Sequence, residues 1–131
     1  MPLLDNIIRV LIVNDQDDIA RLWQRLVNTT TGMQCVGYAK DGEEAVRLAR
    51  QLNPHVIMMD IMMPGMDGLE ATRAIKDTQP DTLIVAYSAY IGMNEKAFAA
   101  GADEFILMPV APNKLLETIR RVYAQARKTL S

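Results

Sequence analysis

The chain has 131 residues, a length that fits one domain with a buried core. Its composition, 50% hydrophobic and 23% charged, is that of a globular protein and argues against disorder. Its net charge of −2, with scattered Lys and Arg residues, excludes a basic surface for nucleic acid or an anionic membrane. A single Cys and a single His exclude an intrachain disulfide and a Cys/His zinc site. No secretory signal and no apolar run of about 20 residues is apparent, so we expect a cytoplasmic protein.

The first predicted unit is an apolar strand over residues 7–13, followed by an amphipathic helix over residues 17–28. The apolar residues of this helix recur at intervals of three and four and so share one face: Ile19, Leu22, Trp23, Leu26 and Val27. We expect this face, including Trp23, to pack into the core. Asp17 and Asp18 suit the first turn, because carboxylates are favourable at a helix N-terminus.

The same alternation continues along the rest of the chain. Further strands are predicted over residues 33–39, 55–60, 81–88 and 104–108. Helices are predicted over residues 41–54, within 64–80 after a turn, and over 94–102 and 111–126. The third strand is apolar without polar alternation, which is typical of a parallel sheet buried on both faces. The sequence therefore predicts an α/β protein of five β-α units, with helices on both faces of a doubly wound parallel sheet.

Polar residues follow three of the predicted strands, at the edge where such sheets carry their sites. Asn14 and Asp15 follow the first strand, Asp60 ends the third and Ser88 ends the fourth. In the flavodoxin-like order 2-1-3-4-5 the first and third strands are neighbours. Their carboxylates would then repel and raise one pKa, unless a hard cation such as Mg²⁺ binds between them. Asp60 is also a candidate nucleophile, since aspartyl phosphates are known covalent intermediates.

Each of these residues also has a purely structural interpretation. Asp15 could cap the first helix, Asp60 could stabilise the turn after its strand, and Ser88 could cap the helix after the fourth strand. Taken one at a time, these interpretations are the simpler ones. Taken together, on three neighbouring strand ends, the residues favour a site for phosphate and metal.

The sequence resembles a response-regulator receiver domain of two-component signalling over essentially its whole length. The segments that carry the resemblance are VLIVND, GYAKDGEEA, PHVIMMDIMMPGMDGLE, VAYSA and GADEFILMP. Within them, the D-x-x-M-P-G-M-D-G pattern is highly specific, and Gly65 and Gly68 suit its tight loop. Walker-type and Rossmann glycine motifs are absent, which weakens nucleotide-binding alternatives. The resemblance implies a single receiver domain over residues 1–131, with its core over about residues 7–126, and the flavodoxin-like (βα)5 fold.

The resemblance also implies a role for each residue at the strand ends. Asp60 would be the phosphoacceptor, Ser88 would hydrogen-bond a phosphoryl oxygen, and Phe105 would be the switch aromatic. The implied Mg²⁺ ligands are Asp15, Asp60, the backbone carbonyl of Met62 and, through a water, Asn14. Asn14 occupies a position that is usually acidic, so the site carries one negative charge fewer.

Met108 departs from the family pattern. Receivers nearly always have Lys immediately before the proline that follows the fifth strand, and its ammonium group contacts the phosphoryl group. The thioether of Met108 offers neither a charge nor a donor. Pro109 is retained, and in the family the bond before it is usually cis. The change to Met108 is compatible both with a site of altered reactivity and with an inactive site.

Three functions follow from these observations. The first is a receiver that accepts a phosphoryl group on Asp60 from a histidine kinase or phosphotransfer protein. It would switch the surface of its fourth helix, fifth strand and fifth helix toward an output protein or domain, and a homodimer through this surface is also open. The second is a phosphorylation-independent interaction module. The third is a metal-dependent phosphatase, which would need a second acid/base carboxylate shortly after Asp60 and a substrate cap. The segment DIMMPG supplies neither. We therefore expect no enzymatic activity beyond self-phosphorylation and self-dephosphorylation. The chain is either a single-domain regulator or a piece of a longer protein.

Overall fold

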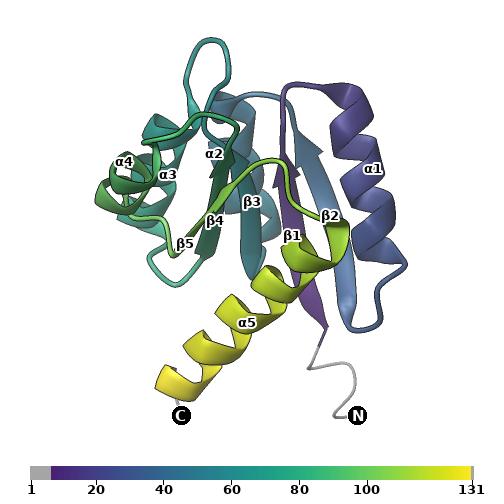
Figure 1. Ribbon diagram of the computed structural model, residues 1–131. Helices are drawn as coiled ribbons and strands as arrows, with labels where there is room; N and C mark the ends of the chain where they lie inside the picture. The colour runs from purple at the N-terminus through teal and green to yellow at the C-terminus, as the bar shows by residue number, and fades with distance from the viewer. Residues whose placement is uncertain (1–6, 131) are drawn as a thin grey trace.

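The computed structural model describes residues 7–130, and side chains as far as residue 128. Strands and helices alternate along it, as the sequence predicts (Figure 1). In chain order they are β1 (Ile8–Val13), α1 (Asp17–Asn28), β2 (Met33–Ala39), α2 (Gly42–Leu52), β3 (Val56–Asp60), α3 (Gly68–Thr78), β4 (Leu83–Ser88), α4 (Asn94–Ala100), β5 (Glu104–Leu107) and α5 (Pro112–Leu130). No helix within the described part of the chain is long and apolar enough to cross a membrane.

The strands form one parallel sheet in the order β2-β1-β3-β4-β5, which confirms the predicted flavodoxin-like topology. Val13 at the end of β1 pairs with Met59 of β3, and Asp60 pairs with Tyr87 of β4. The carboxyl ends of these three strands therefore lie next to one another. Strand order reverses between β1 and β3, so this is also the switch point of the sheet.

Helices cover both faces of the sheet, with α1 and α5 on one face and α2, α3 and α4 on the other (Figure 1). The three central strands contribute buried residues to both layers, which explains why their sequences are apolar without alternation. On the α1 and α5 side, the buried helix residues are Ala20, Val27, Leu115, Ile119 and Val122. On the other side they are Ala45, Ala49, Ala71, Ile75 and Ala97.

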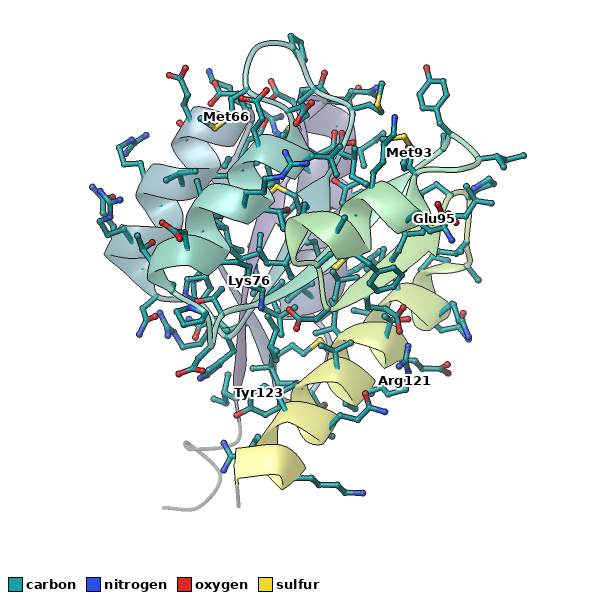
Figure 2. All side chains as sticks on the ribbon, turned by 90° about the vertical axis from the view of Figure 1, so that its left-hand side faces the viewer. Met66, Lys76, Met93, Glu95, Arg121 and Tyr123 are labelled. Atoms are coloured by element: carbon teal, nitrogen blue, oxygen red, sulfur yellow. The ribbon has the colours of Figure 1, made fainter. Side chains whose placement is uncertain are left out.

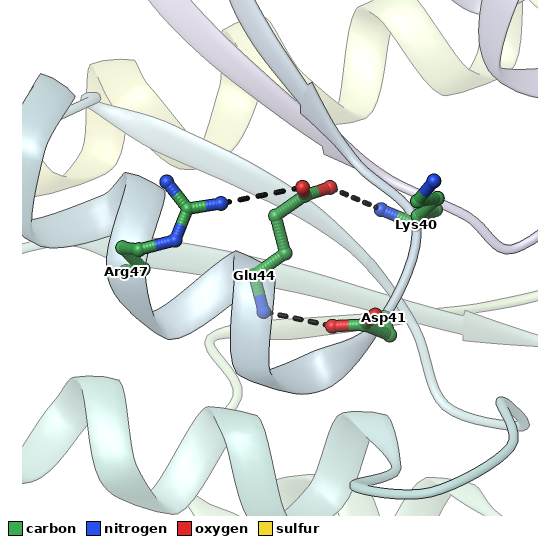
Figure 3. A network of polar contacts seen from close by, with 4 residues as sticks. All are labelled: Lys40, Asp41, Glu44 and Arg47. Carbon is green, nitrogen blue, oxygen red and sulfur yellow. Dashed lines mark hydrogen bonds and ion pairs between the residues drawn. The ribbon is translucent and has the colours of Figure 1, made fainter.

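Helix α2 begins in a network of polar contacts (Figure 3). The carboxylate of Asp41 accepts a hydrogen bond from the Glu44 backbone N–H at 2.8 Å, and that of Glu44 accepts one from the Lys40 backbone N–H at 3.0 Å. Arg47 pairs with Glu44 at 3.3 Å. Because a side-chain cap of this kind stabilises a helix by about 1 kcal/mol, the network fixes where α2 begins.

The loop between β3 and α3 is held close to the end of β3. Gly65 has a φ of +73°, where a side chain is strained. The Gly68 N–H donates to the Ile61 carbonyl at 2.9 Å. A Cβ atom at Gly68 would lie 2.1 Å from the carbonyl oxygen of Asp60. The sequence-based assignment to a tight loop is confirmed for Gly65, whereas Gly68 is the first residue of α3. Gly68 is required because the backbone of Asp60 passes so close.

Two of the differences from the sequence-based expectations lie near the ends of the strands that carry the polar residues. Strand β5 ends at Leu107, because the chain turns at Met108 into a cis bond to Pro109. The cis bond itself agrees with the resemblance. The apolar face of α1 is not fully buried: Leu22 is 53% exposed, and only Ala20 and Val27 of this helix are buried. The prediction of core packing is therefore wrong for Leu22, which faces a groove described below.

Replacing Gly68 with Ala should destabilise the fold by about 3 kcal/mol or more, at the upper end of overpacking costs, since the clash is with backbone atoms. Gly65→Ala, in the loop that precedes α3, is the matched control. It meets no atom within 4 Å, so its cost should be only the strain of a left-handed alanine, about 1 kcal/mol. Urea denaturation of both variants measures the difference, and equal losses would contradict the close approach.

Candidate functional site

A cavity of about 550 Å³ opens where β1, β3 and β4 end. It gathers most of the residues that the sequence predicts for the site: Asn14, Asp15, Asp60, Met62 and Ser88. Met108 and Pro109 also line it, whereas Phe105 does not. Phe105 instead packs against the hydrophobic cluster on the α2, α3 and α4 side of the sheet. The predicted acceptor, metal ligands and switch hydroxyl thus share one cavity, and the role of Phe105 stays a prediction.

Asp60 ends β3 and is partly buried at the floor of this cavity. Burial raises the pKa of the Asp60 carboxyl, and the negative charge of Asp15 raises it further, to about 7. A hydrogen bond at 3.2 Å from the Met62 backbone N–H opposes that rise. The expected repulsion between the two carboxylates is confirmed in direction, although burial is the larger cause.

Asn14 and Tyr87 form a buried hydrogen-bonded pair that joins the end of β1 to β4. Asn14 is only 4% exposed, and its Nδ2 donates to the Tyr87 hydroxyl at 2.9 Å. The hydroxyl in turn donates to the Val13 carbonyl at 2.5 Å, and Asn14 Oδ1 accepts from the Gln16 N–H at 2.8 Å. A hydroxyl has one proton, so a carboxylate at position 14 could receive it only if Val13 lost its donor. The amide therefore suits this position beside Tyr87 better than an acid would.

Sequence reasoning missed the part that Tyr87 plays in the site. Tyr87 is the one residue with a hydroxyl tip inside the apolar run of β4 before Ser88, and a buried tyrosine hydroxyl requires a polar partner. That requirement was the available signal. The ring of Trp23 packs edge-on against the ring of Tyr87, with 4.7 Å between the centroids. Burial, together with the nearby charge of Asp60, raises the pKa of Tyr87 well above its usual value, which keeps the hydroxyl protonated.

Helix capping does not account for Asp15 or Ser88. The N-cap residue of α1 is Gln16, that of α4 is Met93, and neither helix has a capping hydrogen bond from a side chain. Ser88 is buried, and its Oγ accepts from the Tyr90 N–H at 3.0 Å. The structural interpretation holds only for Asp60, which does accept a hydrogen bond from its own turn. Asp15 and Ser88 are thus left available for a ligand in the cavity.

The residues that line the cavity include two carboxylates and no Lys, Arg or His. Met108 is partly buried there and packs against the hydrophobic cluster of the α1 and α5 side. Its backbone N–H donates to the Ser88 carbonyl at 2.8 Å. Lys96 and Lys114, the lysines nearest to it in sequence, lie outside the lining. The charge of the cavity wall is therefore negative.

The donor set fits Mg²⁺. No group of three His, Cys, Asp or Glu side chains able to hold a metal exists among residues 7–128, so the protein does not build a complete cage. Mg²⁺ does not require one, since it keeps several waters and is usually bound through one or two carboxylates together with a phosphate. Asp15 is exposed and Asp60 is partly exposed, so both oxygen donors are accessible to a hydrated ion.

Comparison with known proteins gives consistent results. A family model described as the response regulator receiver domain matches residues 10–120. The response regulator GacA of Pseudomonas protegens is 38% identical over 125 residues, which cover 92% of this chain and 57% of GacA, so the chain spans little more than half of that relative. The response regulator domain of Thermotoga maritima CheB superposes with a TM-score of 0.83 at 34% identity, covering 90% of this chain and 97% of that one. A chain from the CheX–CheY–BeF3–Mg²⁺ complex of Borrelia burgdorferi gives a TM-score of 0.82 at 25% identity, with coverage of 92% and 98%.

The raised pKa of Asp60 predicts how stability depends on pH. Folding moves this pKa from 3.8 to about 7, so the folded state keeps a proton that the unfolded chain releases within this range. Without divalent cations, the free energy of unfolding of the wild type relative to Asp60→Asn should therefore fall as pH rises from about 4 to about 7. We expect a difference on the order of 1 kcal/mol, because solvent screens a partly exposed carboxylate. Urea unfolding at several pH values measures it, and parallel curves would contradict it.

Removing the Tyr87 hydroxyl should destabilise the protein. In Tyr87→Phe the buried Asn14 amide and the Val13 carbonyl both lose a partner, which predicts a loss of about 1–3 kcal/mol with the ring packing retained. Tyr123→Phe is the matched control, because that hydroxyl accepts an exposed hydrogen bond from Arg127 and should cost less than about 0.5 kcal/mol. Equal losses in urea denaturation would show that the buried pair is unimportant.

Proposed function

The chain belongs to the response regulator receiver domain family of two-component signalling, and we propose that Asp60 accepts a phosphoryl group from the phosphohistidine of a histidine kinase or phosphotransfer protein. A receiver domain is a signalling protein and not itself an enzyme. The observation that carries the proposal is the meeting of Asp60, Asp15 and Ser88 in one cavity at the switch point of the sheet. We place the protein in the cytoplasm, where its donor would be.

In the proposed transfer, an oxygen of the Asp60 carboxylate attacks phosphorus while the bond from phosphorus to the histidine nitrogen breaks. The electron pair of that bond stays with the ring nitrogen, and the imidazole, which carries a proton on its other nitrogen, leaves as a neutral histidine. Mg²⁺, when bound by Asp15, Asp60 and the Met62 carbonyl, with Asn14 reaching it through a water, supplies positive charge to the phosphoryl oxygens. Ser88 Oγ accepts from the Tyr90 N–H, so its own proton is available for a phosphoryl oxygen. Because Asp60 must be ionised to attack, ion binding at Asp15 and Asp60 also favours the reactive form.

Met108 sets the expected efficiency of this reaction. Phosphoryl transfer depends on charge stabilisation, and the cavity wall contains no cationic side chain. We therefore propose that transfer proceeds with Mg²⁺ but is slower than in receivers with a lysine at this position. Bulky Met62 and Tyr90, both exposed at the cavity, would shield the product from water and prolong its lifetime.

The output surface of the proposed switch is the edge formed by α4, β5 and α5. This edge faces the viewer in Figure 2, where Glu95 of α4 and Arg121 of α5 are labelled. Two large apolar side chains lie exposed on α4 and β5, namely Phe98 at 48% and Leu107 at 45%. An ion pair at 2.7 Å joins Arg121 of α5 to Glu104 of β5. An exposed apolar patch with a charged border suits a protein partner, which we propose is an output protein, an output domain or a second copy of the chain.

A phosphorylation-independent interaction module is the second candidate, and Met108 is the observation that favours it. In that case the cavity would have lost its chemistry and only the surfaces would remain in use. The two candidates differ in how a partner responds to Asp60→Asn. An unchanged partner affinity in this variant would indicate the module, and a loss of phosphorylation-dependent binding would indicate the receiver.

Incubation with Mg²⁺ and acetyl phosphate or phosphoramidate tests the acceptor. We expect the intact mass of the wild type to rise by one phosphoryl group, with no such rise in Asp60→Asn. Met108→Lys should react about tenfold faster or more, because it adds a cation beside the transferred group. Absence of the adduct in both the wild type and Met108→Lys would refute phosphorylation of Asp60.

A further inference from the structure

The cavity at the strand ends continues as an apolar groove between α1 and the start of α5. Its walls are Ile19, Leu22, Trp23 and Leu26 on one side and Val110 and Leu115 on the other. The sequence predicts that the four residues from α1 pack into the core. Leu22 is instead 53% exposed. The helix thus turns much of its apolar face toward an open groove.

The size and charge of the groove indicate a small ligand of a particular kind. The cavity and the groove together have a volume of about 550 Å³, which lies within the range of small-molecule sites, about 300–1,000 Å³. One end is apolar and has an aromatic wall, whereas the other end holds Asp15 and Asp60 and no cationic side chain. A ligand complementary to both ends has an apolar body and one positive charge.

We propose that the groove binds a small amphipathic primary ammonium ion, with its apolar chain between α1 and α5 and its ammonium group beside Asp15, Asp60 and Met108. This inference rests on the proposed function, since the bound cation would assist phosphoryl transfer to Asp60 as a substitute for a side-chain cation. Met108 lines this part of the cavity and offers an apolar contact in place of a charged side chain.

Phosphorylation and ammonium binding should favour each other. The Asp60 carboxylate carries one negative charge, and a phosphoryl group on it carries about two, so the end of the groove becomes more negative by about one charge. The ammonium ion therefore binds the phosphorylated form more tightly. Because coupling between two binding free energies is reciprocal, the ammonium ion also shifts the equilibrium toward phosphorylation. The proposed ligand would thus act as an activating signal.

Trp23 provides a direct readout of this site. It is the only tryptophan of the chain, it lines the groove and its ring contacts that of Tyr87. Titration of the full chain with butyl-, hexyl- and octylammonium in the presence of Mg²⁺ should change its fluorescence. We expect about fourfold tighter binding for each added methylene until the groove is filled. 1-Hexanol, which has the same chain without the charge, should bind at least about tenfold more weakly than hexylammonium.

Two exposed leucines give matched variants with little risk to folding. Leu22→Gln removes apolar surface from the groove and should weaken hexylammonium binding about fivefold. Leu107→Gln alters a comparably exposed leucine of β5 outside the groove and should leave binding unchanged. Equal effects of the two substitutions, or equal affinities for hexylammonium and 1-hexanol, would overturn the proposal.

The phosphorylation assay separates this inference from the proposed function. Hexylammonium should accelerate the reaction of the wild type with acetyl phosphate about tenfold, and it should not accelerate that of Met108→Lys. If the wild type is phosphorylated at a rate that amines do not change, the ammonium site is refuted, and the proposal that Asp60 is the acceptor is retained. Rapid transfer from a protein phosphodonor without any amine effect overturns it as well, and assigns the groove to side chains of that donor. Amine binding without phosphorylation in either protein overturns the proposed function and the activating role, and retains only the binding site.

Discussion

The parallel pairing of β1, β3 and β4 is the constraint on which the site depends. It brings the ends of three strands to one edge, and so places the carboxylates of Asp15 and Asp60 at a single cavity. Burial at the end of β3, and second to it the negative charge of Asp15, then raises the pKa of the Asp60 carboxyl to about 7. The fold itself thus creates a carboxylate that is unfavourable without a cation. That cost would be lowered by a bound cation, and this reasoning does not depend on any resemblance.

The second constraint is the single proton of the Tyr87 hydroxyl. It is given to the Val13 carbonyl, so the hydroxyl can only accept from the side chain at position 14, and Asn14 has the donor for it. Trp23 packs on the same ring from α1. One aromatic residue of β4 therefore joins three parts of the structure: the end of β1, the end of the cavity that holds Asp15 and Asp60, and the wall of the groove. Asn14 is explained by this contact, without any loss of function in the site.

The sequence was sufficient to predict the topology, because each helix has a clear apolar face and each inner strand is apolar throughout. It was also sufficient to bring Asp15, Asp60 and Ser88 to one edge, because parallel strands end together. It was not sufficient for Leu22, whose spacing on α1 is that of a core residue although no neighbouring element covers it. Nor could it find the contact between Asn14 and Tyr87, which are 73 positions apart and meet only through the sheet. Periodicity reports which face of an element is apolar, and only packing decides what covers that face.

The two departures from the family pattern do not cancel, although their charges are opposite. Asn14 removes a negative charge on the β1 side, and Met108, on the resemblance, removes a positive one after β5. The sum of charges is unchanged, but the two positions lie on different sides of Asp60. Near Asp15, a neutral residue leaves two carboxylates for a divalent ion, which is a sufficient number for Mg²⁺. Near Ser88, the lysine of the family pattern would face the phosphoryl group in the transfer that we propose, and Coulomb energy depends on that separation. On the function we propose, such a site would keep the capacity to hold an ion and would lose stabilisation specific to the phosphoryl group. The apolar groove beside Met108 is where we propose that a diffusible cation restores it.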